Sequence, residues 1–141
     1  MSTYAGWEGE VKIGTSLSAM RSSSAISWES LDADVKNNLK RIFTGGQRDP
    51  EEIKEGLLEI SAKIARKWRD KTTLSDKAGV GSTGALTEYY IGIYPEGYSS
   101  GNTEYYVVGK FDSYKLSLKH DDITREEADF IAKSITVGTV P

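Results

Sequence analysis

The sequence predicts a single, mainly β domain built as a sandwich or barrel. Several short segments alternate apolar and polar residues, clusters of Gly, Ser and Pro separate them, and only one or two segments suit a helix. A chain of 141 residues can bury roughly 68–70% of the surface that its unfolded state exposes. We therefore expect residues 1–141 to form one packed domain, with residues 1–8 as an N-terminal arm.

The first strand is predicted near the N-terminus. Residues 10–17 contain Val11 and Ile13 in alternation with Lys12, which is the pattern of a half-buried strand. Residues 18–24 are mostly polar and predict a connection.

Residues 25–36 predict a second strand, within which the alternation of apolar and polar residues changes phase. Ile26 and Trp28 share one side, and the apolar positions after Ser30 follow the other phase, which a bulge or bend would produce. Residues 44–56 then predict a long polar loop, because a glycine pair favours a turn and a proline breaks strand pairing.

Residues 57–68 fit two kinds of element equally well by periodicity. As a helix, the segment has an apolar face at spacings of three and four, made of Leu57, Ile60, Ile64 and Trp68. As a strand, its apolar face is interrupted at Arg66 and otherwise consists of Leu58, Ile60, Ala62, Ile64 and Trp68. The opposite strand face would carry Glu59, Ser61, Lys63, Lys67 and Arg69.

The next apolar segments predict a hairpin and a further strand. Residues 87–95 and 103–111 are rich in Tyr, Ile and Val, and a Gly- and Ser-containing stretch turns the chain between them. Residues 113–120 show the clearest alternation, with Leu116 and Leu118 on one side.

The last segment has two alternatives over residues 124–133. Thr124 and Glu127 have the spacing of a capping box, which predicts a helix. Ile135 and Val137 alternate with polar neighbours and predict a final strand.

Apolar side chains in phase with one another predict the core. Trp28 and Trp68 both follow the phase of aliphatic neighbours, which favours packing over an exposed stacking face for sugars. The predicted core residues are Trp28, Ile60, Ile64, Trp68, Leu116 and Leu118. The three tryptophans and eight tyrosines still leave a glycan-binding β-sandwich module as an alternative.

The stretch GVGSTG, residues 79–84, has the letters of a dinucleotide fingerprint in the wrong context. A fingerprint turns the chain from a strand into a helix, so that the pyrophosphate meets the helix N-terminus. Here Gly79, Gly81 and Gly84 lead into the strand predicted at 87–95, and no lysine follows the last glycine. We therefore expect no nucleotide cofactor.

No catalytic or metal-binding constellation is predicted. The single histidine, His120, lies beside two aspartates where an exposed turn is expected, and the chain has no cysteine to complete a zinc site. No GxSxG elbow presents a nucleophilic serine. The carboxylate pairs Glu51–Glu52 and Glu126–Glu127 fall in charged stretches that we expect to be solvated. The sequence thus predicts that the protein is not an enzyme.

Charge and hydropathy exclude two further classes of function. The chain has 18 Lys plus Arg against 21 Asp plus Glu, a formal net charge of −3. Tight, sequence-independent binding of nucleic acid is disfavoured, because such affinity comes mainly from neutralising phosphates. No apolar run approaches the ~18 residues of a membrane span, and the N-terminal residues lack the pattern of a signal peptide. We expect a soluble protein without a membrane anchor.

The order of segments resembles that of a known family. EVKIG, AISWESL, GGQRDPEEIKEG running into LLEISAKIARKW, then YYIGIYPEG, VVGKFDSYKLSL and ADFIAKSITV are similar to the tail tube proteins of tailed phages and archaeal viruses. These proteins are related to the tubes of contractile injection systems. The resemblance runs from about residue 9 to residue 138 and rests on segment order, without an active-site motif.

The resemblance implies a fold, an assembly and a role. It implies a β-sandwich or barrel with one short flanking helix, a strand at 57–68, and the helix between about residues 70 and 80. Subunits of such proteins form hexameric rings that stack into the hollow tube through which viral DNA passes. The loop 44–56 would reach the neighbouring ring, where its charged residues would make self-assembly contacts; these are Arg48, Asp49, Glu51, Glu52 and Lys54.

The resemblance also implies partners. The chain would bind further copies of itself, tape measure, tail terminator and baseplate proteins, and, in a contractile tail, a sheath. It would assemble in the host cytoplasm and reside in the virion tail. Six copies would carry about −18 charges per ring, so DNA would pass without specific binding. A tube protein of a contractile injection system is the nearest alternative, followed by the glycan-binding module.

Overall fold

The computed structural model describes residues 6–43, 45–46, 48–49, 52–70, 72, 74–80 and 84–141. Its elements, in chain order, are a 3-10 helix at Gly6–Glu8, β1 at Glu10–Gly14, α1 at Leu17–Ser22, β2 at Ser30–Lys36, β3 at Lys40–Ile42, β4 at Glu52–Lys54, β5 at Glu59–Lys67, β6 at Tyr89–Tyr94, β7 at Thr103–Ser117 and β8 at Arg125–Thr139. The predicted mainly β fold with one short α-helix is confirmed. The described part of the predicted N-terminal arm is the 3-10 helix.

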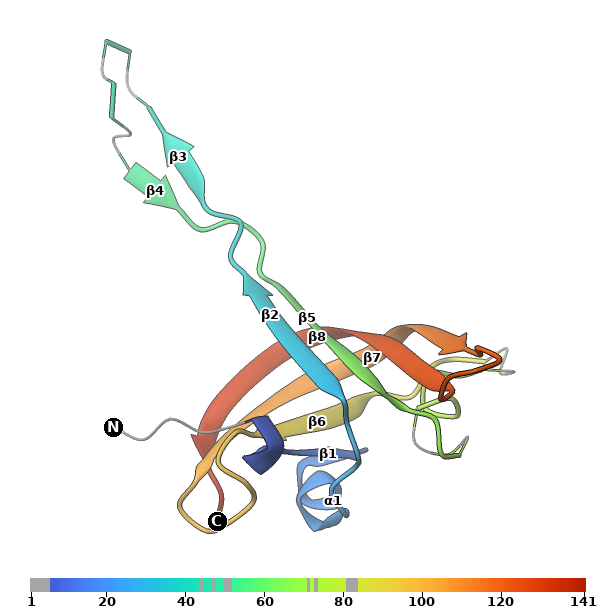
Figure 1. Ribbon diagram of the computed structural model, residues 1–141. Helices are drawn as coiled ribbons and strands as arrows, with labels where there is room; N and C mark the ends of the chain where they lie inside the picture. Colours follow the sequence, from blue (N-terminus) through green and yellow to red (C-terminus); the bar gives the residue numbers. More distant parts are fainter. Residues whose placement is uncertain are drawn as a thin grey trace.

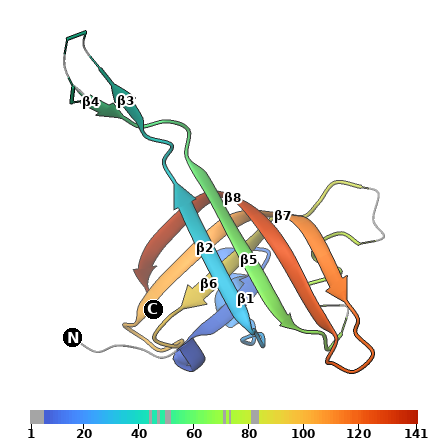
Figure 2. The same ribbon diagram turned by 45° about the horizontal axis from the view of Figure 1, so that its top comes forward.

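Six strands form one antiparallel sheet in the order β1-β6-β7-β8-β5-β2. The sheet is strongly curved, and its long strands β7 and β8 sweep across the body (Figures 1 and 2). Register shifts in β7 occur between Val108 and Gly109 and between Phe111 and Ser113, and such bulges increase bending and twist. A Cβ at Gly109 would overlap the carbonyl oxygen of Ile131, so glycine permits the close approach at the first shift.

The core lies on the two faces of this sheet. The larger cluster covers the face that we call the inner face and contains Val11, Ile13, Ile60, Ala62, Ile64, Leu74, Ile91, Val107, Phe111, Ala128 and Phe130. The smaller cluster, Met20, Tyr94 and Val140, lies where α1 packs against the opposite face of β1 and β6. Curvature allows β1 and β2, the two ends of the sheet, to contribute to one core, because Val11 and Leu31 pack in the same cluster.

The helix lies earlier in the chain than predicted. α1 occupies Leu17, which was predicted as the end of the first strand, and most of the predicted polar connection 18–24. Ser16 caps the helix by accepting a hydrogen bond from the N–H of Ala19, and Met20 anchors it in the core. The family resemblance placed the helix between residues 70 and 80. Of the residues described there, 72 and 74–80 form turns, with Leu74 buried.

The predicted strands are correct in type, and several differ in extent. β2 begins only at Ser30, where the phase change was noted. The N–H of Ile26 instead donates a hydrogen bond to the carbonyl of Val11, outside any strand. The segments 103–111 and 113–120, predicted as two strands, merge into the single strand β7, which continues through its bulges and ends at Ser117.

The two segments with open alternatives are both strands. Residues 57–68 contain β5, whose buried positions alternate as the strand pattern predicts. The helix alternative at 124–133 is wrong, because β8 occupies most of this segment and pairs with β5 on one side and β7 on the other. Two neighbouring strands satisfy the backbone groups that a helix would satisfy internally.

The six predicted core residues divide into two groups. Ile60 and Ile64 are buried, and Trp28 packs half-buried against the cluster that contains them. The other three are exposed, with relative accessibilities of 42% for Trp68, 47% for Leu116 and 76% for Leu118. Assigning these three to the core of the subunit is wrong, because their face of the sheet continues beyond the part that the core covers.

Candidate assembly surfaces

A two-stranded hairpin arm, residues 37–58, projects from the body of the protein (Figure 1). β3 and β4 pair antiparallel, with Lys40 opposite Lys54 and Ile42 opposite Glu52. The predicted loop at 44–56 is therefore partly wrong, because β4 lies within it. Pro50, which was expected to break the pairing, lies outside the described residues.

A tight joint connects the hairpin arm to the body. Three residues separate β2 from β3, whereas four separate β4 from β5, so the two strands of the arm are unequal there. Asn38 has a φ of 52°, and its Nδ2 donates a hydrogen bond of 2.6 Å to the carbonyl of Leu57. The N–H of Gly56 donates to the carbonyl of Asn37 at 3.0 Å.

Gly56 allows the two sides of the joint to come this close. A Cβ at this position would overlap the carbonyl oxygen of Asn38. Asparagine is among the residues that tolerate the left-handed conformation found at Asn38. The joint is thus hydrogen-bonded across both strands and sets the direction in which the hairpin arm leaves the sheet.

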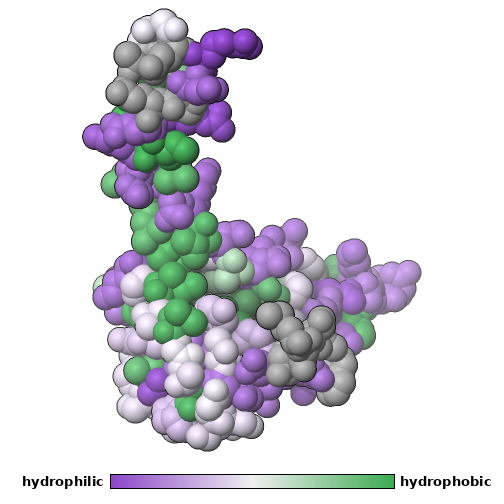
Figure 3. All heavy atoms as spheres, turned by 90° about the vertical axis from the view of Figure 1, so that its left-hand side faces the viewer, coloured by the Kyte–Doolittle hydropathy of each residue, from purple (hydrophilic) through white to green (hydrophobic). Residues whose placement is uncertain are grey.

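The hairpin arm and the end of β2 expose a series of large apolar side chains. We call this set the arm patch; it consists of Val35, Leu39, Phe43, Ile53, Leu57 and Leu58. Figure 3 shows hydrophobic atoms along the arm and down onto the body. Single exposed apolar residues are ordinary, but a contiguous group indicates a surface that binds another molecule.

The predicted self-assembly residues lie on this arm. Arg48 and Asp49 are exposed near its tip, and Glu52 and Lys54 lie in β4, where their side chains form an exposed ion pair of 3.6 Å. Glu51 lies outside the described residues. Sequence reasoning missed the arm patch, because its apolar residues stand singly or in pairs among charged ones and show no periodicity.

The outer face of β2, β5, β8 and β7 is a second uncovered surface, and it is mostly polar, with Ile131 exposed within it. Register places Asp32 opposite Lys63, and Lys63 opposite Asp129. Ser113 Oγ donates a 2.9 Å hydrogen bond to Asp129, and Lys63 lies 3.9 Å from Glu127. Neighbouring charges of opposite sign thus balance one another across the strands.

A buried ion pair lies beneath the sheet where β5 meets β8. Arg66 Nε is 3.3 Å from Glu126 Oε1, and the two side chains are 3% and 0% exposed. The Tyr114 hydroxyl donates a 2.5 Å hydrogen bond to Glu126 Oε2. Burial, together with this bond, raises the pKa of Tyr114. The expectation that Glu126 is solvated is wrong, because its strand alternation points it into the protein.

A second buried carboxylate fastens α1 to β7. Arg21 donates two hydrogen bonds to Glu104, from Nη2 at 2.7 Å and from Nε at 3.1 Å. The Tyr94 hydroxyl adds a third at 2.8 Å. The bonds from Arg21 are the main reason that the pKa of the Glu104 carboxyl lies below its ordinary value.

This arrangement predicts a pH-dependent contribution to stability. Because the pKa of Glu104 is lowered by folding, its stabilisation is present above the ordinary carboxyl pKa and is lost as the pH falls through the folded value. Glu104→Gln should lower the free energy of unfolding by about 1.5–3 kcal/mol near neutral pH. Urea unfolding at about pH 7 and about pH 3 should show that this difference narrows in acid. An equal difference at both pH values would contradict the assignment.

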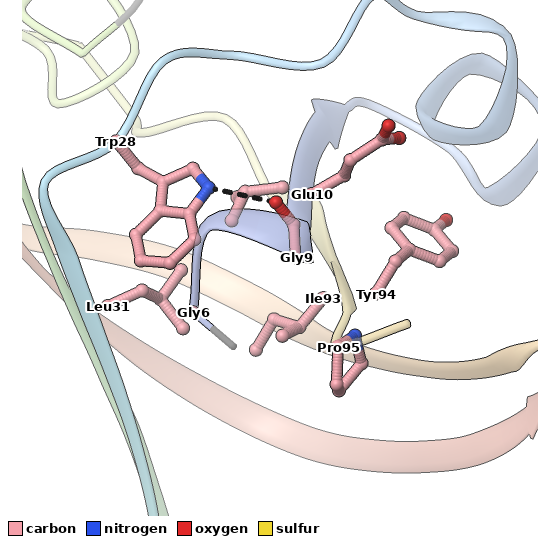
Figure 4. Close-up of a pocket in the computed structure, with 9 residues that line it drawn as sticks. Gly6, Gly9, Glu10, Trp28, Leu31, Ile93, Tyr94 and Pro95 are labelled. Atoms are coloured by element: carbon pink, nitrogen blue, oxygen red, sulfur yellow. Dashed lines mark hydrogen bonds between the residues drawn. The ribbon is translucent and has the colours of Figure 1, made fainter. Parts of the chain in front are cut away.

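A hollow of about 210 Å³ lies between the ends of β1, β2 and β6. Figure 4 shows the Trp28 ring along one side, with its Nε1 donating a 3.4 Å hydrogen bond to the carbonyl of Gly9. Glu10 is the one charged side chain among the described residues that line it. Ligand pockets combine apolar walls with several convergent polar groups, so this hollow does not favour the glycan-binding alternative.

The remaining predicted features lie apart from these surfaces. His120 is in an exposed turn after β7. Gly79 has a φ of 77° and ends a turn, and Gly81 lies outside the described residues. Within the described ranges, no cluster of three or more His, Cys, Asp or Glu could hold a metal ion. No helix among the residues that the structure describes is long and apolar enough to cross a membrane.

The fold is shared with solved tube assemblies, although neither a family model nor a curated relative matches the sequence. A chain of the sheath–tube complex of the PVC extracellular contractile injection system, in its extended state, is 15% identical with a TM-score of 0.72, over 98% of this chain and 93% of that one. The SPP1 tail tube is 8% identical with a TM-score of 0.70, over 99% and 81%. A chain of the gene transfer agent tail is 10% identical with a TM-score of 0.66, over 99% and 100%.

These likenesses cover nearly all of this chain at low sequence identity, and they therefore show its fold. The chain has the fold of tail tube proteins. Within this fold, the chain combines a curved antiparallel sheet, a short α-helix packed on one face of it, and a projecting hairpin arm.

Proposed function

We propose that the chain is the structural protein of a tail tube, in which hexameric rings stack into a hollow conduit. The observation that carries the proposal is the hairpin arm, which extends beyond the body and exposes the apolar arm patch. A lone subunit gains nothing from such a projection, whereas a neighbouring copy would cover it. The gene transfer agent tail, whose chain has this fold, was resolved with C6 symmetry.

The free edges of the sheet suit closure into a ring. β1 and β2 stand at the two ends of the strand order, so each has one edge without a neighbouring strand. On β1, the carbonyl of Val11 already accepts a hydrogen bond from Ile26, and the rest of that edge would pair. Exposed edges invite association with other chains. A heterologous contact repeated by a closing rotation produces a ring, and pairing between neighbours would satisfy both edges.

The hairpin arm would then connect one ring to the next. Arg48, Asp49, Glu51, Glu52 and Lys54 would make polar contacts around its apolar centre. Each exposed pair would contribute only about 0.2–1 kcal/mol. Six arms acting together would gain from multivalency, since after the first contact the others form within the same pair of rings.

The passage of DNA and the further partners follow from this role. A net charge of −3 per chain gives about −18 per hexameric ring, which favours passage of DNA without specific binding. The tube would contact tape measure, terminator and baseplate proteins, and a sheath in a contractile tail. It would assemble in the host cytoplasm, reside in the virion tail and catalyse no reaction.

A tube of a contractile injection system is a second candidate. The likeness to a chain of the PVC sheath–tube complex favours it. Its subunit, ring and stacking would be the same, and the cargo would differ.

Electron microscopy of the purified protein and of an arm-shortened variant tests the proposal. Lys40 and Lys54 are opposite each other, so residues 41–53 can be replaced by Asn-Gly, a favoured two-residue hairpin turn. We expect tubes from the parent chain, and from the variant a folded subunit that does not elongate. Gly45→Ala, which adds a methyl group to the arm where no atom lies within 4 Å, keeps the arm at full length and serves as the control. Long tubes from the shortened variant would contradict the role of the arm.

A further inference from the structure

The inner face of β5 is apolar over a greater length than the core of the subunit covers. Ile60, Ala62 and Ile64 are buried in the middle of the strand. At its ends, Leu58 and Trp68 continue the same alternation, yet they are 56% and 42% exposed. The apolar face of this strand is therefore uncovered at both ends.

Two residues of β7 and its continuation extend the uncovered surface around Trp68. Lys115, Ser117 and Lys119 line a hollow on the outer face, so the alternating positions Leu116 and Leu118 belong to the inner face. Leu116 lies opposite Glu126 in register, and β5 ends beside the start of β8, where the N–H of Trp68 donates to the carbonyl of Thr124. We call this second surface the ledge; it consists of Trp68, Leu116 and Leu118.

The arm patch and the ledge contain most of the exposed large hydrophobic side chains. Nine of the 15 exposed large hydrophobic side chains among the described residues belong to these two groups. They lie at opposite ends of β5, whose nine residues span about 30 Å. The arm patch of a subunit cannot cover the ledge of the same subunit. The arm patch of a second copy, displaced along the direction of β5, can cover it.

We infer that the arm patch of one copy packs on the ledge of the next copy, so that the inner face of β5 continues from subunit to subunit. Each copy carries one donor and one acceptor surface, and the two differ in structure. Such a heterologous contact repeats without closing when the copies are related by translation along the strand. The inference rests on the proposed function for its setting, because it identifies what the hairpin arm binds in the neighbouring ring.

The joint supports this assignment to a neighbouring copy. The bonds between Asn38 and Leu57 and between Gly56 and Asn37 hold the arm extended from the end of β5. An arm held in this direction points away from the ledge of its own subunit. The arm patch can then reach a ledge only on another copy.

Cysteine cross-linking tests the contact, because the natural chain has no cysteine. Leu58→Cys and Leu118→Cys are both exposed positions, so neither change disturbs the core. Under mild oxidation of the assembled protein, the double variant should form a ladder of covalent oligomers on a denaturing gel. Each single variant should remain monomeric, and an equal mixture of the two should stop at covalent dimers.

The outcomes separate this inference from the proposed function. A matched control combines Leu58→Cys with Val137→Cys, which is exposed elsewhere on the sheet and should give no ladder. Tubes that form without a ladder, or dimers from Leu58→Cys alone, would overturn the contact and leave the tube intact. A ladder from assemblies that are not tubes would support the contact and count against the tube.

Discussion

Glu126→Ala should lower the free energy of unfolding by about 3–5 kcal/mol, because it leaves the buried Arg66 without its counter-ion. Arg66 is 3% exposed and lies 3.3 Å from Glu126, so water cannot replace the lost carboxylate. The Tyr114 hydroxyl would also lose its acceptor. Equilibrium urea unfolding near neutral pH measures the change.

Glu127 provides a matched control for this prediction. It is the next residue along β8, but it points to the outer face and forms only a 3.9 Å ion pair with Lys63. Glu127→Ala should cost at most about 1 kcal/mol, as exposed ion pairs do. Replacing both Arg66 and Glu126 by apolar residues of similar size should recover most of the loss. A cost for Glu126→Ala as small as that of Glu127→Ala would show that the buried pair does not stabilise the fold.

The same pair shows what sequence reasoning could and could not find. The alternation through β5 placed Arg66 on the apolar side as an exception, which was correct. Its partner was out of reach, because only the pairing of β5 with β8 brings Glu126 to Arg66. Two adjacent glutamates in a charged stretch suggest that both are solvated. Only once the segment is known to be a strand is it clear that Glu126 and Glu127 point to opposite faces of the sheet.

Local interruptions explain the errors in element boundaries. α1 is six residues long, too short to show a helical period, so Ser16 and Leu17 were read as the end of the first strand and the rest of the helix, including Met20, as a polar connection. β7 was divided in two because its bulges at Gly109 and near Ser113 interrupt the alternation. The hydrogen-bonded ladder continues across both interruptions, which only the paired strand β8 reveals.

The errors in the core assignment have a different cause. Periodicity correctly predicts which face carries Trp68, Leu116 and Leu118. It does not indicate how far along that face the covering elements extend, and within one subunit they stop short of these residues. If the ledge binds a neighbouring arm, the apolar pattern in the sequence describes the core of the assembly.

Gly56→Ala should prevent tube elongation while leaving the subunit folded. The added Cβ would overlap the carbonyl oxygen of Asn38, so the joint must open and the hairpin arm must leave the sheet in another direction. Opening the joint releases the hydrogen bonds from Gly56 to Asn37 and from Asn38 to Leu57, each worth about 0.5–1.5 kcal/mol. Because the joint lies outside both core clusters, we expect the subunit to remain folded. If each of six arms loses about 1 kcal/mol of contact, ring stacking weakens by about four orders of magnitude.

Gly45→Ala is the matched control, since it adds the same methyl group to the same arm at a position with no atom within 4 Å. Electron microscopy should show tubes of parental length for Gly45→Ala and single rings or short stacks for Gly56→Ala. Circular dichroism and urea unfolding would establish that both subunits are folded. Both variants add one methyl group to the arm, but only Gly56→Ala adds it inside the joint. Tubes of parental length from Gly56→Ala would therefore mean that the direction of the arm does not control stacking.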